Sequence, residues 1–138
     1  MTKEDKELLF KDLHARLQYK VFVKYKTTRN PAIVKTIDNE KLIICREYSS
    51  FVHSWECCID DIKPYLRPMS SMTEKEWETL RLLKGKLIEC DENNDEKFYG
   101  IINEIHTFYY SYHIDCNGLI DKGLALEAPE DMYKISNE

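Results

Sequence analysis

The sequence predicts one α+β domain with a helix at its N terminus, a four-stranded antiparallel meander and a mainly helical C-terminal half. Leucines recur every four residues near the N terminus, four alternating runs follow with short connections, and helical periodicity returns after residue 72. A chain of 138 residues, 43% of them hydrophobic, can bury one core. We therefore expect a single domain over 1–138, in which 1–69 form a β-rich lobe and 70–138 a mainly helical lobe.

The first half of the chain divides into a helix and four strands. Leu9, Leu13 and Leu17 share one side of a helix, which Thr2 can cap together with Asp5. The strands are expected at 19–26, 32–37, 41–48 and 51–59. Strands joined by short loops form an antiparallel meander. Such a meander closes into a small barrel or stays an open curved sheet covered by helices, and the sequence leaves both open.

A connector and a helix are expected next. Pro64 and Pro68 lie within 60–72, and prolines at this density favour an ordered connector over a strand. Thr73 and Glu76 have the spacing of a capping box, which predicts that a helix starts at this point. Gly85 is well placed to end that helix.

The C-terminal part is expected to hold a second helix and a tail. Residues 98–114 repeat apolar side chains at helical spacing, which predicts a helix, although the aromatic and β-branched stretch 107–114 also permits a strand. Residues 124–129 are expected to pack back as an extended tail.

The net charge of −5 hides a gradient along the chain. Residues 1–29 carry eight Lys and Arg against four Asp and Glu, whereas residues 85–138 carry four against twelve. The excess therefore changes from +4 to −8. Such polarity is typical either of solvated helix faces or of a basic end that meets nucleic acid.

Aromatic side chains mark the first candidate site, a protein-binding surface on the helix at 98–114. Its candidate residues are Tyr99, Tyr109, Tyr110 and Tyr112. One narrow helix face cannot bury so many rings, and exposed aromatic clusters commonly mark protein interfaces. The alternative is that the tail at 124–129 covers them.

A basic and aromatic strand near 19–29 marks the second candidate site, a nucleic-acid-binding edge. Its candidate residues are Lys20, Lys24, Lys26 and Arg29. Cations interleaved with aromatic rings can follow phosphates and stack bases. Lysines on an edge strand also block unwanted strand pairing, and the isoelectric point of about 5.4 does not favour nucleic acid.

No pattern indicates a metal ion, a cofactor or a catalytic residue. Asp91, Asn93 and Asp95 match the first three ligand positions of a calcium loop, but Glu96 and Ile102 fill positions that need glycine and a carboxylate. No zinc-type pairing of ligands is found, and an enzyme would need a cysteine, a histidine and a carboxylate joined in one pocket.

The compartment is expected to be cytoplasmic. Five cysteines without a disulfide-type spacing suggest reduced thiols. The first ten residues hold no apolar stretch of signal-peptide length, and no apolar run approaches the roughly 20 residues of a membrane span.

Three stretches resemble a known group of proteins. Residues 63–76 (KPYLRPMSSMTEKE), 118–133 (GLIDKGLALEAPEDMY) and 6–21 are similar to short uncharacterised proteins of gut Bacteroides genomes, prophages and phages. The chain departs from the group at Asp115–Gly118, where Asp-Tyr-Arg-Gly is expected, and at 18–20, where Pro-Tyr-Gly is expected. The resemblance implies a cytoplasmic protein of a phage or mobile element inside a bacterial host, and it supplies no catalytic residues.

These observations together predict a non-enzymatic protein-interaction or regulatory module. Its partner is expected to be a protein, with a host factor as one candidate, and a homo-oligomer is also open. The alternative function is that of a small β-barrel that binds nucleic acid through the basic strand. No membrane association is expected.

Overall fold

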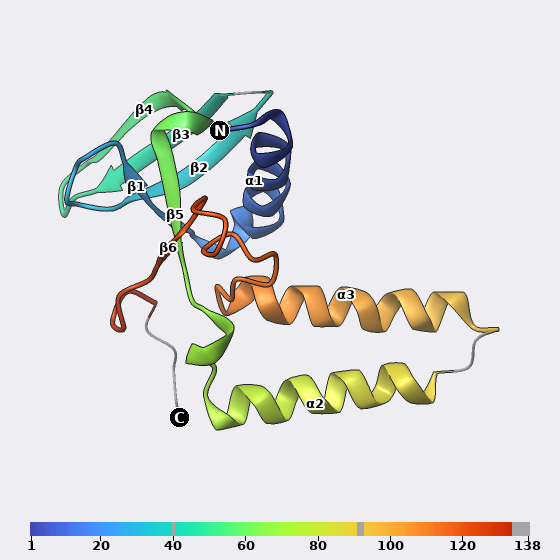
Figure 1. Ribbon diagram of the computed structural model, residues 1–138. Helices are drawn as coiled ribbons and strands as arrows, with labels where there is room; N and C mark the ends of the chain where they lie inside the picture. The colour runs from blue at the N-terminus through green and yellow to red at the C-terminus, as the bar shows by residue number, and fades with distance from the viewer. Residues whose placement is uncertain (40, 91–92, 134–138) are drawn as a thin grey trace.

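The computed structural model describes residues 1–39, 41–90 and 93–133, which form an α+β structure (Figure 1). The first position of the calcium-loop pattern, Asp91, lies outside the described residues. The helices are α1 (Lys3–Arg16), α2 (Glu74–Glu89) and α3 (Asp95–Ser111). The strands are β1 (Phe22–Tyr25), β2 (Ala32–Asp38), β3 (Lys41–Glu47), β4 (Val52–Cys58), β5 (Ile62–Leu66) and β6 (Leu126–Glu127).

The strands form one six-stranded sheet in the order β4-β3-β2-β1-β5-β6. The four expected strands pair as an antiparallel meander, which confirms that part of the prediction. The sheet then continues beyond the meander, because β5 pairs antiparallel with β1 and the short β6 pairs parallel with β5. The expectation of four strands was therefore too low by two.

Strand β5 was missed because it contains Pro64, which has no N–H to give to a neighbour. Pro64 pairs with Val23 of β1, but β6 joins β5 only at Tyr65 and Leu66. On that flank Pro64 therefore lies on a free edge, where a proline is tolerated.

The sheet is open, so the small barrel is not formed. It is nevertheless strongly curled, since the rings of Tyr25 on β1 and Trp55 on β4 lie 5.4 Å apart although β2 and β3 separate their strands. Right-handed twist in a meander of short strands brings its ends together in this way. The curl leaves a concave face that needs a cover.

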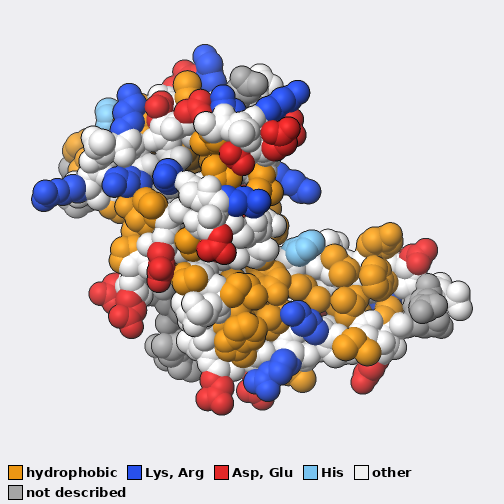
Figure 2. Space-filling model, in the orientation of Figure 1, with side chains coloured by type: hydrophobic (Ala, Val, Ile, Leu, Met, Phe, Trp, Pro, Cys, Tyr) orange, Lys and Arg blue, Asp and Glu red, His pale blue; other side chains and the backbone are white. Residues whose placement is uncertain are grey.

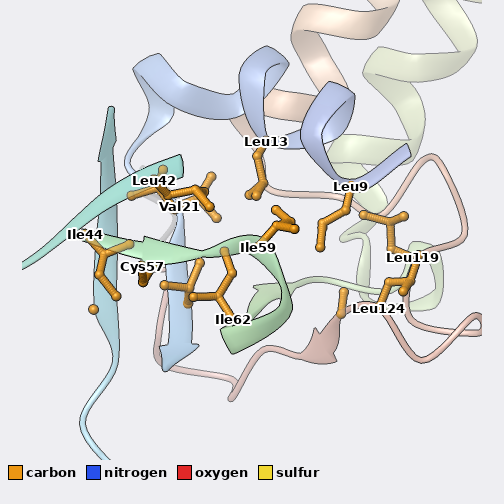
Figure 3. Close-up of a cluster of buried hydrophobic side chains, with 14 of the residues drawn as sticks. Leu9, Leu13, Val21, Leu42, Ile44, Cys57, Ile59, Ile62, Leu119 and Leu124 are labelled. Carbon is orange, nitrogen blue, oxygen red and sulfur yellow. The ribbon is translucent and has the colours of Figure 1, made fainter. Parts of the chain in front are cut away.

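Helix α1 covers that face and builds the larger hydrophobic core (Figure 3). Leu9 and Leu13 point from the helix onto the sheet, where they join Leu42 and Ile62. Thr2 and Asp5 form the expected capping box, which fixes where α1 begins. The chain returns to this core near its C-terminal end through Leu119, so the β-rich lobe includes residues from both ends of the chain.

The second core lies between α2 and α3. Leu80 of α2 and Ile101, Ile105 and Phe108 of α3 are its buried members on the two helices. Thr73 and Glu76 form the expected capping box at the start of α2. The helix does not end at Gly85 as expected but runs to Glu89, because a glycine inside a helix costs only about 1 kcal/mol.

A buried ion pair joins the two parts. Arg67, just after β5, donates to both carboxylate oxygens of Glu76 at 2.9 and 2.7 Å, and also to the carbonyls of Ser71 and Tyr112. The guanidinium therefore links the end of β5 to the start of α2 and to the end of α3.

Candidate functional site

Helices α2 and α3 form an antiparallel hairpin that extends away from the sheet (Figure 1). The hairpin packs on itself through the second core, and its base is attached to the sheet by the Arg67–Glu76 pair. Its far half lies well outside the sheet lobe in Figure 1. Side chains on its flanks are therefore open to a partner.

One flank of the hairpin is apolar on both helices. Trp77 and Ile88 lie about three turns apart on the same side of α2. Phe98, Ile102 and Tyr109 share one side of α3 by the same spacing rule. Antiparallel packing brings these two sides to a common flank, and we call its five residues, Trp77, Ile88, Phe98, Ile102 and Tyr109, the hairpin face.

Three of the five residues of the hairpin face are exposed to solvent. The exposed fraction of Ile88 is 83%, that of Phe98 is 40% and that of Trp77 is 37%. Figure 2 shows hydrophobic side chains spread along both helices on the flank turned to the viewer, with Lys and Arg between them. Exposed apolar side chains gathered on one flank, with charged residues between them, are typical of a docking surface.

The charges between these apolar residues are cationic. Arg81 and Lys84 lie on α2 between Trp77 and Ile88, and the Arg81 Nε donates to the Trp77 carbonyl at 3.4 Å. The opposite flank is different, since an open pocket of about 560 Å³ there is lined by residues of both charges. Those residues include Lys86, Lys97 and Glu104.

The four tyrosines expected to bind a partner do not converge on one surface. Tyr99 is 63% exposed, on the outer side of α3. Tyr109 is half-buried and belongs to the hairpin face. Tyr110 is half-buried against the Arg16 guanidinium, whose carbon lies 4.9 Å from the ring centre, and Tyr112 packs its ring on Phe108 at 5.1 Å. Successive helix positions point in different directions, so these tyrosines, although close in sequence, are distributed around the axis of α3.

The sequence pattern did not reveal that apolar residues of two helices share one flank of the hairpin. Ile88 was not singled out, because a lone isoleucine near a helix end carries no motif. Trp77 lies three residues before Leu80, a spacing typical of one packed helix side, yet Leu80 is buried and Trp77 is exposed. Exposed positions become visible only once the register of the hairpin is known.

A pocket of about 500 Å³ opens beside Tyr109, between the base of the hairpin and the C-terminal segment. Asp115 and Cys116 line it, and so do Met69 and Ile120. The Asp115 carboxylate accepts the backbone N–H groups of Leu119 and Ile120 at 2.8 and 2.9 Å, so it caps a turn. No histidine is among the lining residues, and burial raises the pKa of the Cys116 thiol.

The Cys57 thiol is a poor candidate for a nucleophile as well. Cys57 is buried, and burial together with nearby Asp61 raises its pKa to about 11. A thiol with a raised pKa is mostly protonated at neutral pH and is a poor nucleophile. In the parts of the chain that the structure describes, no three His, Cys, Asp or Glu side chains are placed to hold a metal ion.

The basic residues of the alternative site are split between surfaces. Lys20 forms an exposed ion pair with Glu47 at 3.2 Å. Lys24 and Lys26 line an open pocket of about 280 Å³ that also holds Lys63, Asp60 and Asp61. Arg29 lies in the loop between β1 and β2. The structure therefore brings Lys24 and Lys26 to one pocket, whereas Lys20 is paired with an acid.

No protein-family model, no curated protein and no solved structure matches this chain. Among the described residues, no helix combines the length and the apolar character that crossing a membrane requires. Its function must therefore be inferred from the chemistry of its own surfaces.

Proposed function

We propose that this protein is a non-enzymatic protein-interaction module, and that its hairpin face binds an amphipathic helix of a partner. The observation that carries this proposal is the exposed apolar surface on the same flank of both hairpin helices. Two antiparallel helices with a free apolar flank can add a further helix, as in a helical bundle.

The charge of the hairpin face indicates the chemistry of the partner helix. Arg81 and Lys84 lie between the apolar ends of the face, so a complementary helix carries Asp or Glu at its centre and apolar residues on either side. Burying the apolar flank supplies the affinity, and the charges select the partner and its orientation.

A second copy of the chain fits this face less well than such a helix. Two-fold antiparallel packing would place Trp77 of one copy near Ile88 of the other, which is favourable. The same packing would place Arg81 opposite Lys84, and like charges facing each other at an interface are unfavourable. The partner is therefore expected to be a different protein.

A regulatory role in a bacterial host is the setting that the resemblance to phage and mobile-element proteins supports. In that setting the partner is a host protein with an exposed acidic helix. The Asp115 carboxylate already accepts backbone hydrogen bonds, and the raised pKa values of the Cys57 and Cys116 thiols favour their protonated form. Both observations support a role without catalysis.

The test compares three baits in a bacterial host lysate: the wild type, the double variant Ile88→Asp with Phe98→Asp, and the control Leu82→Asp. Leu82 is 67% exposed but lies on the other side of α2, so the control adds a similar charge away from the face. We expect a protein that the wild type and the control retain and the double variant loses.

Carbodiimide coupling gives the second readout, because it joins lysine amines to neighbouring carboxylates. We expect Lys84 to be joined to an Asp or Glu of the retained protein. The proposal fails if all three baits retain the same proteins, if none retains any, or if the coupling maps to the opposite flank. Dimerisation by sedimentation that the double variant abolishes would assign the face to a second copy instead.

A further inference from the structure

The end of the curled sheet carries a second surface, made of aromatic rings and cations. Its residues are Tyr25, Lys26, Arg46, Phe51, His53 and Trp55, and we call them the sheet-end cluster. They come from β1, β3 and β4, from the turn after β1 and from the turn before β4. This surface lies on the sheet, so it is separate from the hairpin face.

The geometry at the centre of the cluster is a layered stack. The rings of His53 and Trp55 lie 5.3 Å apart and nearly parallel, with an interplanar angle of 29°. The Arg46 guanidinium lies 5.2 Å from the Trp55 ring, and Tyr25 meets Trp55 edge to face. The register of β3 against β4 produces this stack, since Arg46 pairs with His53.

The stack ends in exposed rings. His53 is exposed, and Phe51, in the turn before β4, has an exposed fraction of 59%. The Phe51 ring stacks on Tyr48 at 4.8 Å, and Tyr48 is 48% exposed. Neither ring takes part in the hydrophobic core that the described residues form, so each has one flat face, the one turned away from the other ring, that is available to another planar ring.

Cations surround these rings. The Arg46 Nη2 donates to the Thr28 hydroxyl at 3.1 Å and to the Asn30 carbonyl at 3.0 Å, so the loop that contains Arg29 is held beside the stack. The Lys26 ammonium lies 5.2 Å from the centre of the Tyr25 ring. Glu47 and Glu56, which follow Arg46 and Trp55 in sequence, alternate to the other face of their strands and pair with Lys20 and Lys41. Tyr25 and nearby Asp61 raise the pKa of the Lys26 ammonium group.

The cluster also holds polar groups that the fold itself does not satisfy. The Trp55 Nε1 and the Arg46 Nε are buried and have no hydrogen-bond partner in the described part of the chain. Unsatisfied buried donors are rare in folded proteins, and each calls for an explanation. The Arg46 guanidinium lies over the Trp55 ring, and a cation–π contact of this kind contributes about 0.5–2 kcal/mol, which offsets part of that cost.

We propose that the sheet-end cluster binds nucleotides of single-stranded nucleic acid. Phe51 and His53 offer ring faces on which unstacked bases lie, and Lys26 and Arg29 meet the phosphates that connect them. A duplex offers no free base face, so it is a poor ligand for this surface. Lys26 and Arg29 belong to residues 1–29, a stretch with a positive excess in an otherwise acidic chain.

The test measures fluorescence anisotropy of short labelled single-stranded DNA and RNA, with the duplex of the same sequence as a comparison and unlabelled nucleoside monophosphate as a competitor. The full chain is used. The variants are Phe51→Ser with His53→Ser for the rings, and Arg29→Gln for a phosphate contact. The matched controls are Tyr99→Ser, an exposed ring on α3, and Lys11→Gln, an exposed cation on α1.

We expect the ring variant to weaken single-strand binding by about fivefold or more, because each stacked base contributes at least that factor. Arg29→Gln should reduce the slope of log affinity against log salt by about 0.7, the value for one phosphate contact with a single strand. Both control variants should bind like the wild type. Trp55 fluorescence, measured in a Trp77→Phe background, should change on binding.

Several outcomes would overturn the proposal. These are salt-insensitive or absent single-strand binding, tighter binding to the duplex, unchanged affinity in the ring variant, and no response of Trp55. Monophosphate that binds as tightly as the oligonucleotide would keep the nucleotide site but identify a free nucleotide as its ligand. Loss of this binding would leave the hairpin proposal untouched, because the two surfaces share no residue.

Discussion

The rings of His113 and Tyr133 stack face to face, with centroids 3.7 Å apart and planes 13° from parallel. Tyr133 follows the last strand, and His113 follows α3, so the stack fastens the end of the chain to the base of the hairpin. The Tyr133 hydroxyl accepts the Phe22 N–H at 2.9 Å and donates to the Tyr65 carbonyl at 2.7 Å. One side chain therefore links β1, β5 and the segment after α3.

Removing the Tyr133 hydroxyl should destabilise the fold. In Tyr133→Phe the Phe22 N–H and the Tyr65 carbonyl lose their shared partner while the ring stack remains. We expect the free energy of unfolding to fall by about 1–3 kcal/mol, the usual cost of unsatisfied buried groups. Urea denaturation measures this, with Tyr99→Phe on the exposed side of α3 as the unaffected control. Equal stability of the two variants would contradict the role of the hydroxyl.

His113 should make stability depend on pH. Burial, with the nearby Arg16 and Arg67 cations, lowers its pKa from 6.5 to about 4. Between these values the unfolded state takes up a proton that the folded state does not, so stability is full above about pH 6.5 and falls as the pH drops to about 4.

The matched variant for this pH effect is His113→Asn, because His113 has a φ of 61° and asparagine tolerates that conformation. The difference in unfolding free energy between wild type and variant should change by about 3 kcal/mol across this pH range. Denaturation at a series of pH values measures it, and a difference that stays constant would show that the imidazole does not titrate in this way.

Breaking the Arg67–Glu76 pair should be costly. Burial alone would raise the pKa of Glu76, but the hydrogen bonds and charge of Arg67 and the cap from Thr73 outweigh it, so the pKa lies below its ordinary value. Arg67→Met leaves the carboxylate buried without its partner, and we expect a loss of about 3–5 kcal/mol near neutral pH.

Acid should relieve this loss, since protonated Glu76 needs no cation. The wild type gains stability from the pair above the ordinary carboxyl pKa and loses it as the pH falls, so the two proteins should converge at low pH. Arg81→Met on the surface of α2 is the control and should change stability by less than about 0.5 kcal/mol. A pH-independent difference would argue against the ion pair.

Two glycines should respond oppositely to alanine. Gly85 lies inside α2, and a Cβ built there meets no atom within 4 Å, so Gly85→Ala should raise stability by about 0.5–1 kcal/mol. Gly118 has a φ of +68°, a conformation that costs other residues about 1–2 kcal/mol, so Gly118→Ala should lower stability. Thermal unfolding of both variants measures this, and a destabilised Gly85→Ala would indicate that α2 is strained at this point.

Local chemistry accounts for the parts of the fold that could be predicted. Capping at Thr2 and Thr73 needs only residues within one turn, and the strand runs alternate visibly, so their elements were found. Pro64 led to the prediction of a connector in place of β5. A proline is tolerated in a strand whose flank is free, and the free flank is known only once the neighbouring strands are known. The predicted end of α2 at Gly85 was wrong, because packing against α3 outweighs the low helix propensity of glycine.

The candidate surfaces were harder to predict, for a related reason. The aromatic richness of α3 was visible, but the direction of each ring depends on the helix register, which separated Tyr99 from Tyr109 and Tyr112. Arg46, His53 and Trp55 carry no motif in sequence. They meet Tyr25 only because the sheet curls.

The sequence by itself determined the α+β class, the helix starts, the antiparallel meander and the polarity of charge, since each depends on neighbours within a few residues. The tertiary structure alone decided that the sheet stays open with six strands, and which apolar and aromatic side chains remain exposed. Exposure is a property of what packs over a residue, and the covering segments come from distant parts of the chain. For that reason the hairpin face and the sheet-end cluster became visible only in three dimensions.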